Sequence, residues 1–169
     1  SPRAISIPAP ASRSAISWRS CAILIDGNNI DKGIHEAYGA NFALNYDAFV
    51  PRILKNRQLR TLYYFREGKS ISPKLTQRLA DNYFGITIPC HKSADVQLVI
   101  SAIELIDKVD TIILLSGDVD FLPLIQHLQS RGIRTEVAAM PHTVHHMVKE
   151  TAHNFMPIMR YDTYEITKK

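Results

Sequence analysis

Residues 111–121, TIILLSGDVDF, join an apolar run directly to a turn that carries two aspartates, Asp118 and Asp120. A run this uniformly apolar indicates a β-strand buried on both faces, because a strand with one solvent face alternates with polar residues. The two carboxylates that follow it repel each other. Solvent, a turn, a helix N-terminus or a bound cation must therefore offset that repulsion.

Strand-like and helix-like segments alternate on both sides of this stretch. We expect strands over residues 21–25, 60–65, 85–89, 110–116, 133–139 and 155–159. We expect helices over residues 47–56, 72–83, 93–108, 118–132 and 142–152. This alternation predicts an α/β fold, a Rossmann-like parallel sheet flanked by helices on both faces in a three-layer α/β/α arrangement.

Other parts of the chain have less regular patterns. Residues 26–29, DGNN, follow the apolar strand CAILI and indicate a turn. Residues 1–18 are rich in Ser, Ala and Pro, and we expect an extended or mobile arm there. A single domain is expected over residues 19–160, followed by a C-terminal tail over residues 161–169.

The composition excludes several classes of protein. The chain has 169 residues, 46% hydrophobic and 21% charged, which is typical of a soluble globular domain. No apolar run is long enough to span a membrane, and residues 1–14 lack the apolar centre of a signal peptide. Two cysteines, Cys21 and Cys90, make neither a disulfide framework nor a zinc site, so we expect a reducing, cytoplasmic setting.

Positive charge is concentrated in one segment. The net charge is +4, and residues 51–80 hold eight basic side chains with Glu67 as the only acid. Such a segment fits a phosphate-binding surface and an ordinary solvated surface equally well.

Four aspartates are expected at one edge of the sheet. Asp26 and Asp118 each follow a buried strand, and in open α/β sheets functional groups gather beyond the carboxyl ends of the strands. Asp95 falls in the first turn of a helix, where the dipole alone favours a carboxylate by roughly 0.3–1 kcal/mol. Together with Asp120, these acids form a dense set of hard oxygen ligands, which suits Mg²⁺ or Mn²⁺.

Other sites have weaker support. His142, His145, His146 and Glu150 fall at helical spacing, but they lack the HExxH order, and four residues on one helix cannot all point to one zinc ion. The Asp-x-Asp pair lacks the longer spacing of a calcium-binding EF-hand. The acyl-transfer, P-loop and dinucleotide motifs GxSxG, GxxxxGK[ST] and GxGxxG are absent.

Three stretches, ILIDGNN (23–29), HKSADV (91–96) and LLSGDVDFLPLIQHLQSRGIRTEV (114–137), resemble the NYN domain family of PIN-like ribonucleases. The resemblance covers roughly residues 20–158 and implies a PIN-like fold. It departs at His153, where family members often carry an aspartate, so no role is transferred to that position.

The resemblance also implies roles for individual residues. Metal would be held by Asp26, Asp95 and Asp118, with Asp120 as a ligand or an outer acceptor. Asn29 and Ser116 would orient water or phosphate, and Lys92 would neutralise a phosphate oxygen or brace a carboxylate. The side chains expected to contact nucleic acid are Arg66, Lys69, Lys92 and Tyr64.

The implied activity is that of a Mg²⁺- or Mn²⁺-dependent endoribonuclease, which hydrolyses phosphodiester bonds of single-stranded RNA by metal-activated water. One alternative is a non-catalytic RNA-binding module with the same acidic pocket. A phosphoryl-handling domain ranks last, because Lys92 lies too early for a receiver. The sequence leaves open a preference for DNA, a homo-oligomer and a protein partner.

Overall fold

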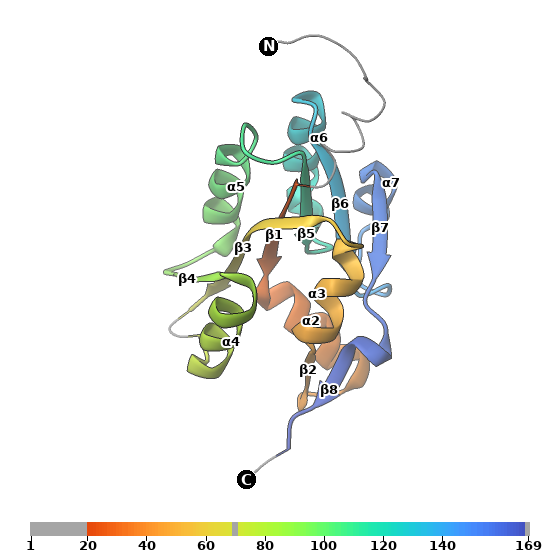
Figure 1. Ribbon diagram of the computed structural model, residues 1–169. Coiled ribbons are helices and arrows are strands. Elements are labelled where there is room, and N and C mark those ends of the chain that lie inside the picture. Colours follow the sequence, from red (N-terminus) through yellow and green to blue (C-terminus); the bar gives the residue numbers. More distant parts are fainter. Residues whose placement is uncertain (1–19, 69–70, 168–169) are drawn as a thin grey trace.

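The computed structural model describes residues 20–68 and 71–167 and confirms the expected α/β architecture (Figure 1). Six parallel strands form one sheet in the order β4-β3-β1-β5-β6-β7. Their bounds are β1 Ser20–Asp26, β3 Gln58–Glu67, β4 Ile86–Cys90, β5 Thr111–Leu115, β6 Arg134–Ala139 and β7 Asn154–Pro157. A separate antiparallel pair consists of β2 Phe42–Leu44 and β8 Thr163–Glu165.

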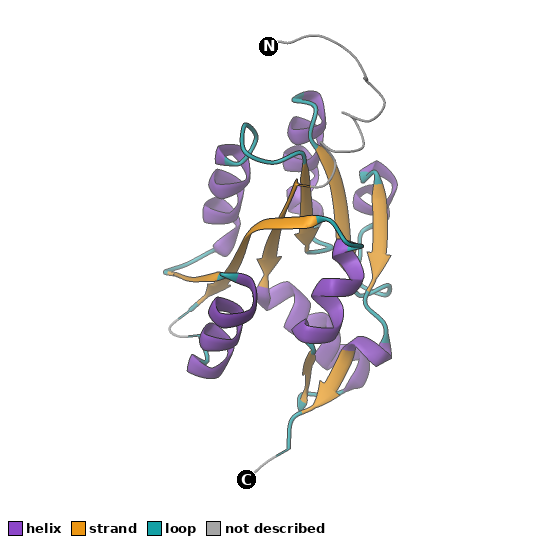
Figure 2. Ribbon diagram, in the orientation of Figure 1, coloured by secondary structure: helices purple, strands orange, loops and turns teal. Residues whose placement is uncertain are grey.

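Helices cover both faces of the six-stranded sheet (Figure 2). The α-helices are α2 Gly27–Tyr38, α3 Tyr46–Leu54, α4 Pro73–Tyr83, α5 Ala94–Glu104, α6 Leu122–Ser130 and α7 His146–Thr151. Short 3₁₀ turns occupy η1 Val119–Phe121 and η2 Arg160–Asp162. Within the described residues, no helix has both the length and the apolar character needed to cross a membrane.

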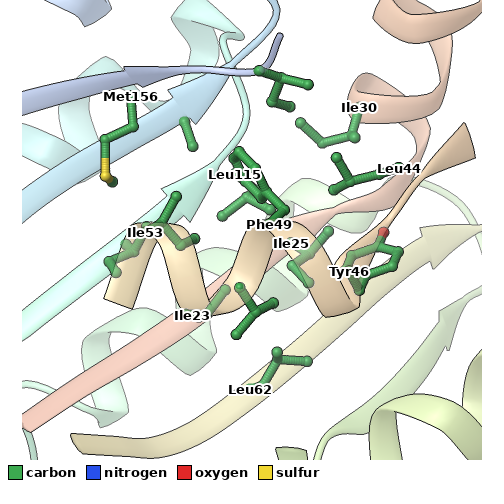
Figure 3. Packing of buried hydrophobic residues seen from close by; sticks show 14 of the residues in the cluster. Ile23, Ile25, Ile30, Leu44, Tyr46, Phe49, Ile53, Leu62, Leu115 and Met156 are labelled. Atoms are coloured by element: carbon green, nitrogen blue, oxygen red, sulfur yellow. The ribbon is translucent and has the colours of Figure 1, made fainter. Parts of the chain in front are cut away.

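The core is divided between the two faces of the sheet. On β1, Ile23 and Ile25 face α2, α3 and α4, where Phe49 is fully buried (Figure 3). Ala22 and Leu24 point the other way, into a second cluster with α5, α6 and α7. Because side chains alternate along a strand, a strand between two helical layers is apolar at every position, which explains the runs CAILI and TIILL.

Two expectations about local structure were wrong. Residues 26–29 do not form a turn, because Asp26 ends β1 and caps α2, accepting a hydrogen bond from the Asn29 backbone N–H at 3.4 Å. The expected C-terminal tail contains β8, which pairs with β2. Asp162 fixes this segment by accepting hydrogen bonds from the Arg52 guanidinium on α3. The expected N-terminal arm, residues 1–18, lies outside the described residues.

Several large apolar side chains of α5 point away from the sheet. Ala94, Leu98 and Ala102 face the sheet, because small alanine side chains let the helix approach the strands closely. Val96 and Ile100 are 63% and 52% exposed. A helix that is apolar on most sides does not reveal from its sequence which side is buried.

A buried ion pair connects the turn after α3 to β6 of the sheet. Glu136 on β6 is 1% exposed and accepts two hydrogen bonds from Arg57, each 2.9 Å long, and one from Arg134 at 2.8 Å. Burial alone would raise the pKa of Glu136, but the hydrogen bonds from these two arginines outweigh it and lower that pKa. The pair therefore contributes stability above the ordinary Glu pKa and loses it as the pH falls.

We predict that Arg57→Met lowers the free energy of unfolding by about 3 kcal/mol at pH 7.5, because it leaves a buried carboxylate with one partner fewer. Urea unfolding measures this. The matched control is Arg60→Met, an exposed arginine on β3. The difference between the two variants should narrow toward pH 4, and equal stabilities at pH 7.5 would contradict the structural role of this pair.

Candidate active site

The site lies where β1 and β5 end side by side. Ile25 pairs with Leu115 in parallel register, so the next residues of both strands, Asp26 and Ser116, emerge at the same edge. The Ser116 hydroxyl donates a hydrogen bond of 3.1 Å to Asp26 Oδ2. Both side chains are buried, which fixes this carboxylate at the floor of the site.

Further hydrogen bonds hold the loop after β5 against α2. Ser116 Oγ accepts from the Asp118 backbone N–H at 3.2 Å, and Asn29 Oδ1 accepts from the Gly117 N–H at 3.1 Å. Gly117 is required for close packing, since a Cβ there would lie 2.7 Å from Val144 Cα. Asn29 and Ser116 therefore order the loop that presents Asp118.

Three carboxylates converge above this floor. Asp95, Asp118 and Asp120 each offer an oxygen within 4.8 Å of the others. Asp118 caps the η1 turn by accepting from the Asp120 N–H at 2.9 Å, and Ser93 Oγ accepts from the Asp95 N–H at 3.1 Å. Asp95, Asp118 and Asp120 therefore meet as the sequence led us to expect. Asp26 is not part of this group, but it is buried nearby, close enough for the charges of Asp95 and Asp118 to act on it.

The acids perturb one another electrostatically. Burial, with smaller contributions from the charges of Asp95 and Asp118, raises the pKa of Asp26 to about 6. The hydrogen bonds from the Asn29 N–H and the Ser116 hydroxyl oppose that rise. Burial and then the charges of Asp118 and Asp120 raise the pKa of Asp95. A positive charge among these groups would relieve both effects.

The donor set fits a hard divalent cation. All three converging groups are carboxylates, and oxygen ligands of this kind suit Mg²⁺ or Mn²⁺ better than zinc. Among residues 20–68 and 71–167, the histidines of α7 and the preceding turn form no comparable group. His142 instead lies 3.6 Å from Glu36.

Several residues near the acids had no clear sequence signal. Glu67, at the end of β3, is close enough for its charge to raise the pKa of Asp95. Lys32 and His145 line a groove of about 450 Å³ that includes Asn29 and Asp118. Lys32 lies on α2, a helix that the sequence pattern did not predict. For His145 the sequence pattern indicated only a weak zinc site.

The expected nucleic-acid contacts lie in different environments. Lys92 is exposed in the loop that leads to Asp95, whereas Arg66 forms an ion pair of 2.8 Å with Asp31. Tyr64 was a wrong expectation, because it is 2% exposed and leaves no ring face for a base. Lys69 lies outside the described residues.

His153, which occupies the position of departure from the family pattern, lies away from the acids. Its ring Nδ1 accepts from the Thr135 N–H at 3.0 Å, near the start of β6 and thus at the opposite edge of the sheet. The residue therefore extends the β6–β7 pairing.

The family comparison agrees with this geometry. The NYN domain model matches residues 20–159. The chain belongs to the NYN domain family. This NYN domain is also similar to the crystal structure of VPA0982, a protein of unknown function from Vibrio parahaemolyticus, with a TM-score of 0.74 and 24% sequence identity over 88% of this chain and 98% of that chain. That similarity supports the PIN-like fold, and a comparison with curated proteins gave no match.

We predict that Asp26→Asn stabilises the protein when divalent ions are removed with EDTA. The folded pKa of Asp26 lies above its unfolded value, so this residue costs stability as the pH rises from 3.8 to about 6. A shift of that size corresponds to about 3 kcal/mol and to a rise in Tm of about 6–12 °C at pH 8.

Thermal unfolding at pH 4 and pH 8 checks this prediction. The advantage of Asp26→Asn should be absent at pH 4, because Asp26 is protonated there in the folded state. Asp107→Asn, which removes an exposed acid beyond the end of α5, is the control and should change Tm little at either pH. A lower Tm for Asp26→Asn at pH 8 would contradict the account of the buried carboxylate.

Proposed function

We propose that this NYN domain is a metal-dependent endoribonuclease that hydrolyses phosphodiester bonds of single-stranded RNA with Mg²⁺ or Mn²⁺. The observation that carries the proposal is the convergence of Asp95, Asp118 and Asp120 within 4.8 Å at the carboxyl edge of the sheet. Membership of the NYN family adds support for nuclease chemistry.

The converging carboxylates are the residues that would hold the cation, and Asp26 would complete the negative environment from below. A divalent metal at such a site lowers the pKa of bound water and stabilises charge on the scissile phosphate. Asp26 is nearly buried, so it is placed to bind from the floor of the site without direct contact with bulk solvent.

The polar residues of the site have restricted roles. Ser116 is fully buried, which argues against a serine nucleophile, and its hydroxyl donates to Asp26 and accepts from the Asp118 N–H within the fold. The Asn29 carbonyl is engaged by Gly117, which leaves the two N–H groups of its amide to donate to a phosphate oxygen in the groove. Hydrolysis by water thus fits this site better than a covalent intermediate.

Charge beside the acids supports binding of a phosphate backbone. Lys32 lines the groove beside Asp118, together with Glu36 and His145, and Lys92 is exposed in the loop that leads to Asp95. A groove of about 450 Å³ lies within the size range of small-ligand sites, which favours one flexible strand over a duplex. Free, buried Cys21 and Cys90 are compatible with the reducing cytoplasm that we propose for its location.

We predict that the purified protein cuts a circular single-stranded RNA in the presence of Mn²⁺, and that Asp118→Asn lowers kcat/KM roughly 10³-fold. Loss of several kcal/mol of metal-assisted stabilisation corresponds to a decrease of that size. A circular substrate has no ends, so its cleavage demonstrates endonuclease action. Gel analysis of labelled products measures the rate.

The control variant is Asp107→Asn, which should cleave at the wild-type rate. A circular DNA of the same sequence tests the preference for RNA. RNA that is bound but never cut with any divalent metal would instead identify a non-catalytic RNA-binding module. Hydrolysis of a simple phosphate monoester without RNA cleavage would identify a phosphoryl-handling enzyme.

A further inference from the structure

A second pocket shares no lining residue with the groove beside Asp118. Its volume is about 270 Å³, and residues of α2, α4 and the β2–β8 pair line it. The residues that matter most are Leu44, Tyr46, Tyr64, Lys74, Arg78 and Tyr164. The pocket thus combines an apolar, aromatic interior with two cationic side chains.

Tyr46 places a hydrogen-bond donor in the pocket. Its side chain lines the pocket and is 5% exposed, yet its hydroxyl forms no hydrogen bond within the described residues. The neighbouring Tyr64 hydroxyl, by contrast, accepts from Arg66 at 2.7 Å. Among the described residues, Thr111 Oγ1 is the buried side-chain polar atom without a partner, so the Tyr46 hydroxyl is open to the pocket and free to donate to a bound molecule. Burial raises the pKa of Tyr46, which keeps this hydroxyl protonated and able to donate.

The cations of the pocket are placed to bind an anion. Lys74 and Arg78 are exposed and four residues apart on α4, so they share one face of that helix. Lys74 lies in the first turn of α4, directly after the Ser72 cap, where the helix dipole also favours negative charge. Asp31, the acid that lines the pocket, is paired with Arg66 at 2.8 Å.

The pocket is close to the acidic site. Gly27, which follows Asp26, is so near the pocket that a Cβ on it would lie 2.5 Å from the Tyr64 hydroxyl. Asp31 lines the pocket five residues after Asp26, a distance of about 7.5 Å along the axis of α2. Figure 1 shows α2 beginning at the end of β1, with the β2–β8 pair beside it. A strand bound at the acids could therefore continue over α2 into the pocket.

We propose that this pocket binds one unpaired nucleotide, with the base against the Tyr164 ring and the Tyr46 hydroxyl and the phosphate at Lys74 and Arg78. Where that nucleotide belongs to the substrate strand, the inference rests on the proposed ribonuclease function. A volume of about 270 Å³ is near the lower limit for small-ligand sites and suits a single base. Tyr164, which is 39% exposed, offers a ring face for stacking, and the Tyr46 hydroxyl donates to a base acceptor.

The test is binding of a fluorescently labelled single-stranded RNA octamer in EDTA, measured by anisotropy. Tyr46→Phe should weaken binding by about 2- to 10-fold, the effect of one hydrogen bond, without lowering Tm, since no protein partner is lost. Tyr164→Ala should weaken binding by about 5- to 100-fold through lost stacking. Lys74→Ala should also reduce the slope of log K against log salt concentration by about 1.

Matched controls are Tyr161→Ala, an exposed tyrosine outside the pocket, and Lys108→Ala, an exposed lysine beyond α5. Both should bind as the wild type does. Competition by AMP and UMP distinguishes the two sources of a nucleotide. If AMP or UMP displaces the octamer from the wild type but not from Tyr46→Phe, free nucleotides are ligands of the pocket. If neither mononucleotide displaces the octamer and the pocket variants still bind it more weakly, the pocket binds a nucleotide of the strand.

Binding and cleavage separate this inference from the proposed function. Weaker RNA binding by the pocket variants of a protein that never cuts RNA would support the pocket and remove the ribonuclease. If all three pocket variants cleave RNA with the wild-type KM and bind the octamer with the wild-type affinity, the ribonuclease function is supported and the proposal for the pocket is overturned. The proposal for the pocket is also overturned if the wild type binds neither the octamer nor the mononucleotides.

Discussion

Mutual repulsion among the carboxylates at one edge of the sheet is the constraint on which the functional account depends. Asp95, Asp118 and Asp120 each offer an oxygen within 4.8 Å of the others. The charges of Asp118 and Asp120 help to raise the pKa of Asp95, and those of Asp95 and Asp118 help to raise the pKa of Asp26. The fold must hold these groups together against that repulsion. A site that costs stability when empty of positive charge is well suited to bind a cation, because binding recovers the lost free energy.

The parallel sheet supplies the force that opposes the repulsion. Burial of β1 and β5 on both faces fixes their register, and the register brings Asp26 beside Ser116. The hydrogen bond between Asn29 and Gly117 then joins α2 to the loop that carries Asp118. Core packing on the two sides of the sheet thus determines the geometry of polar groups at its edge. The helix α2 also contributes Asp31 to the lining of the nearby pocket.

The sequence was sufficient to predict the sheet and the acids, since uniform apolar runs locate buried strands and the residues after them share an edge. It was insufficient for α2, because Gly27, Asn28, Asn29 and Gly33 all weaken its helical signal. Missing that helix also concealed Lys32. The burial of Tyr64 depends on which face of β3 meets α2, and the exposed side of α5 depends on close approach by alanines. Those facts follow from packing between segments and not from local pattern.

The most direct test of the central claim is the position of Mn²⁺ in a crystal of this protein, located by anomalous diffraction. The account predicts an anomalous peak within coordination distance of carboxylate oxygens of Asp95 and Asp118, and loss of that peak in Asp118→Asn crystals. A peak elsewhere, or side chains that remain apart with no bound ion at millimolar Mn²⁺, would contradict the claim that these acids form a metal site.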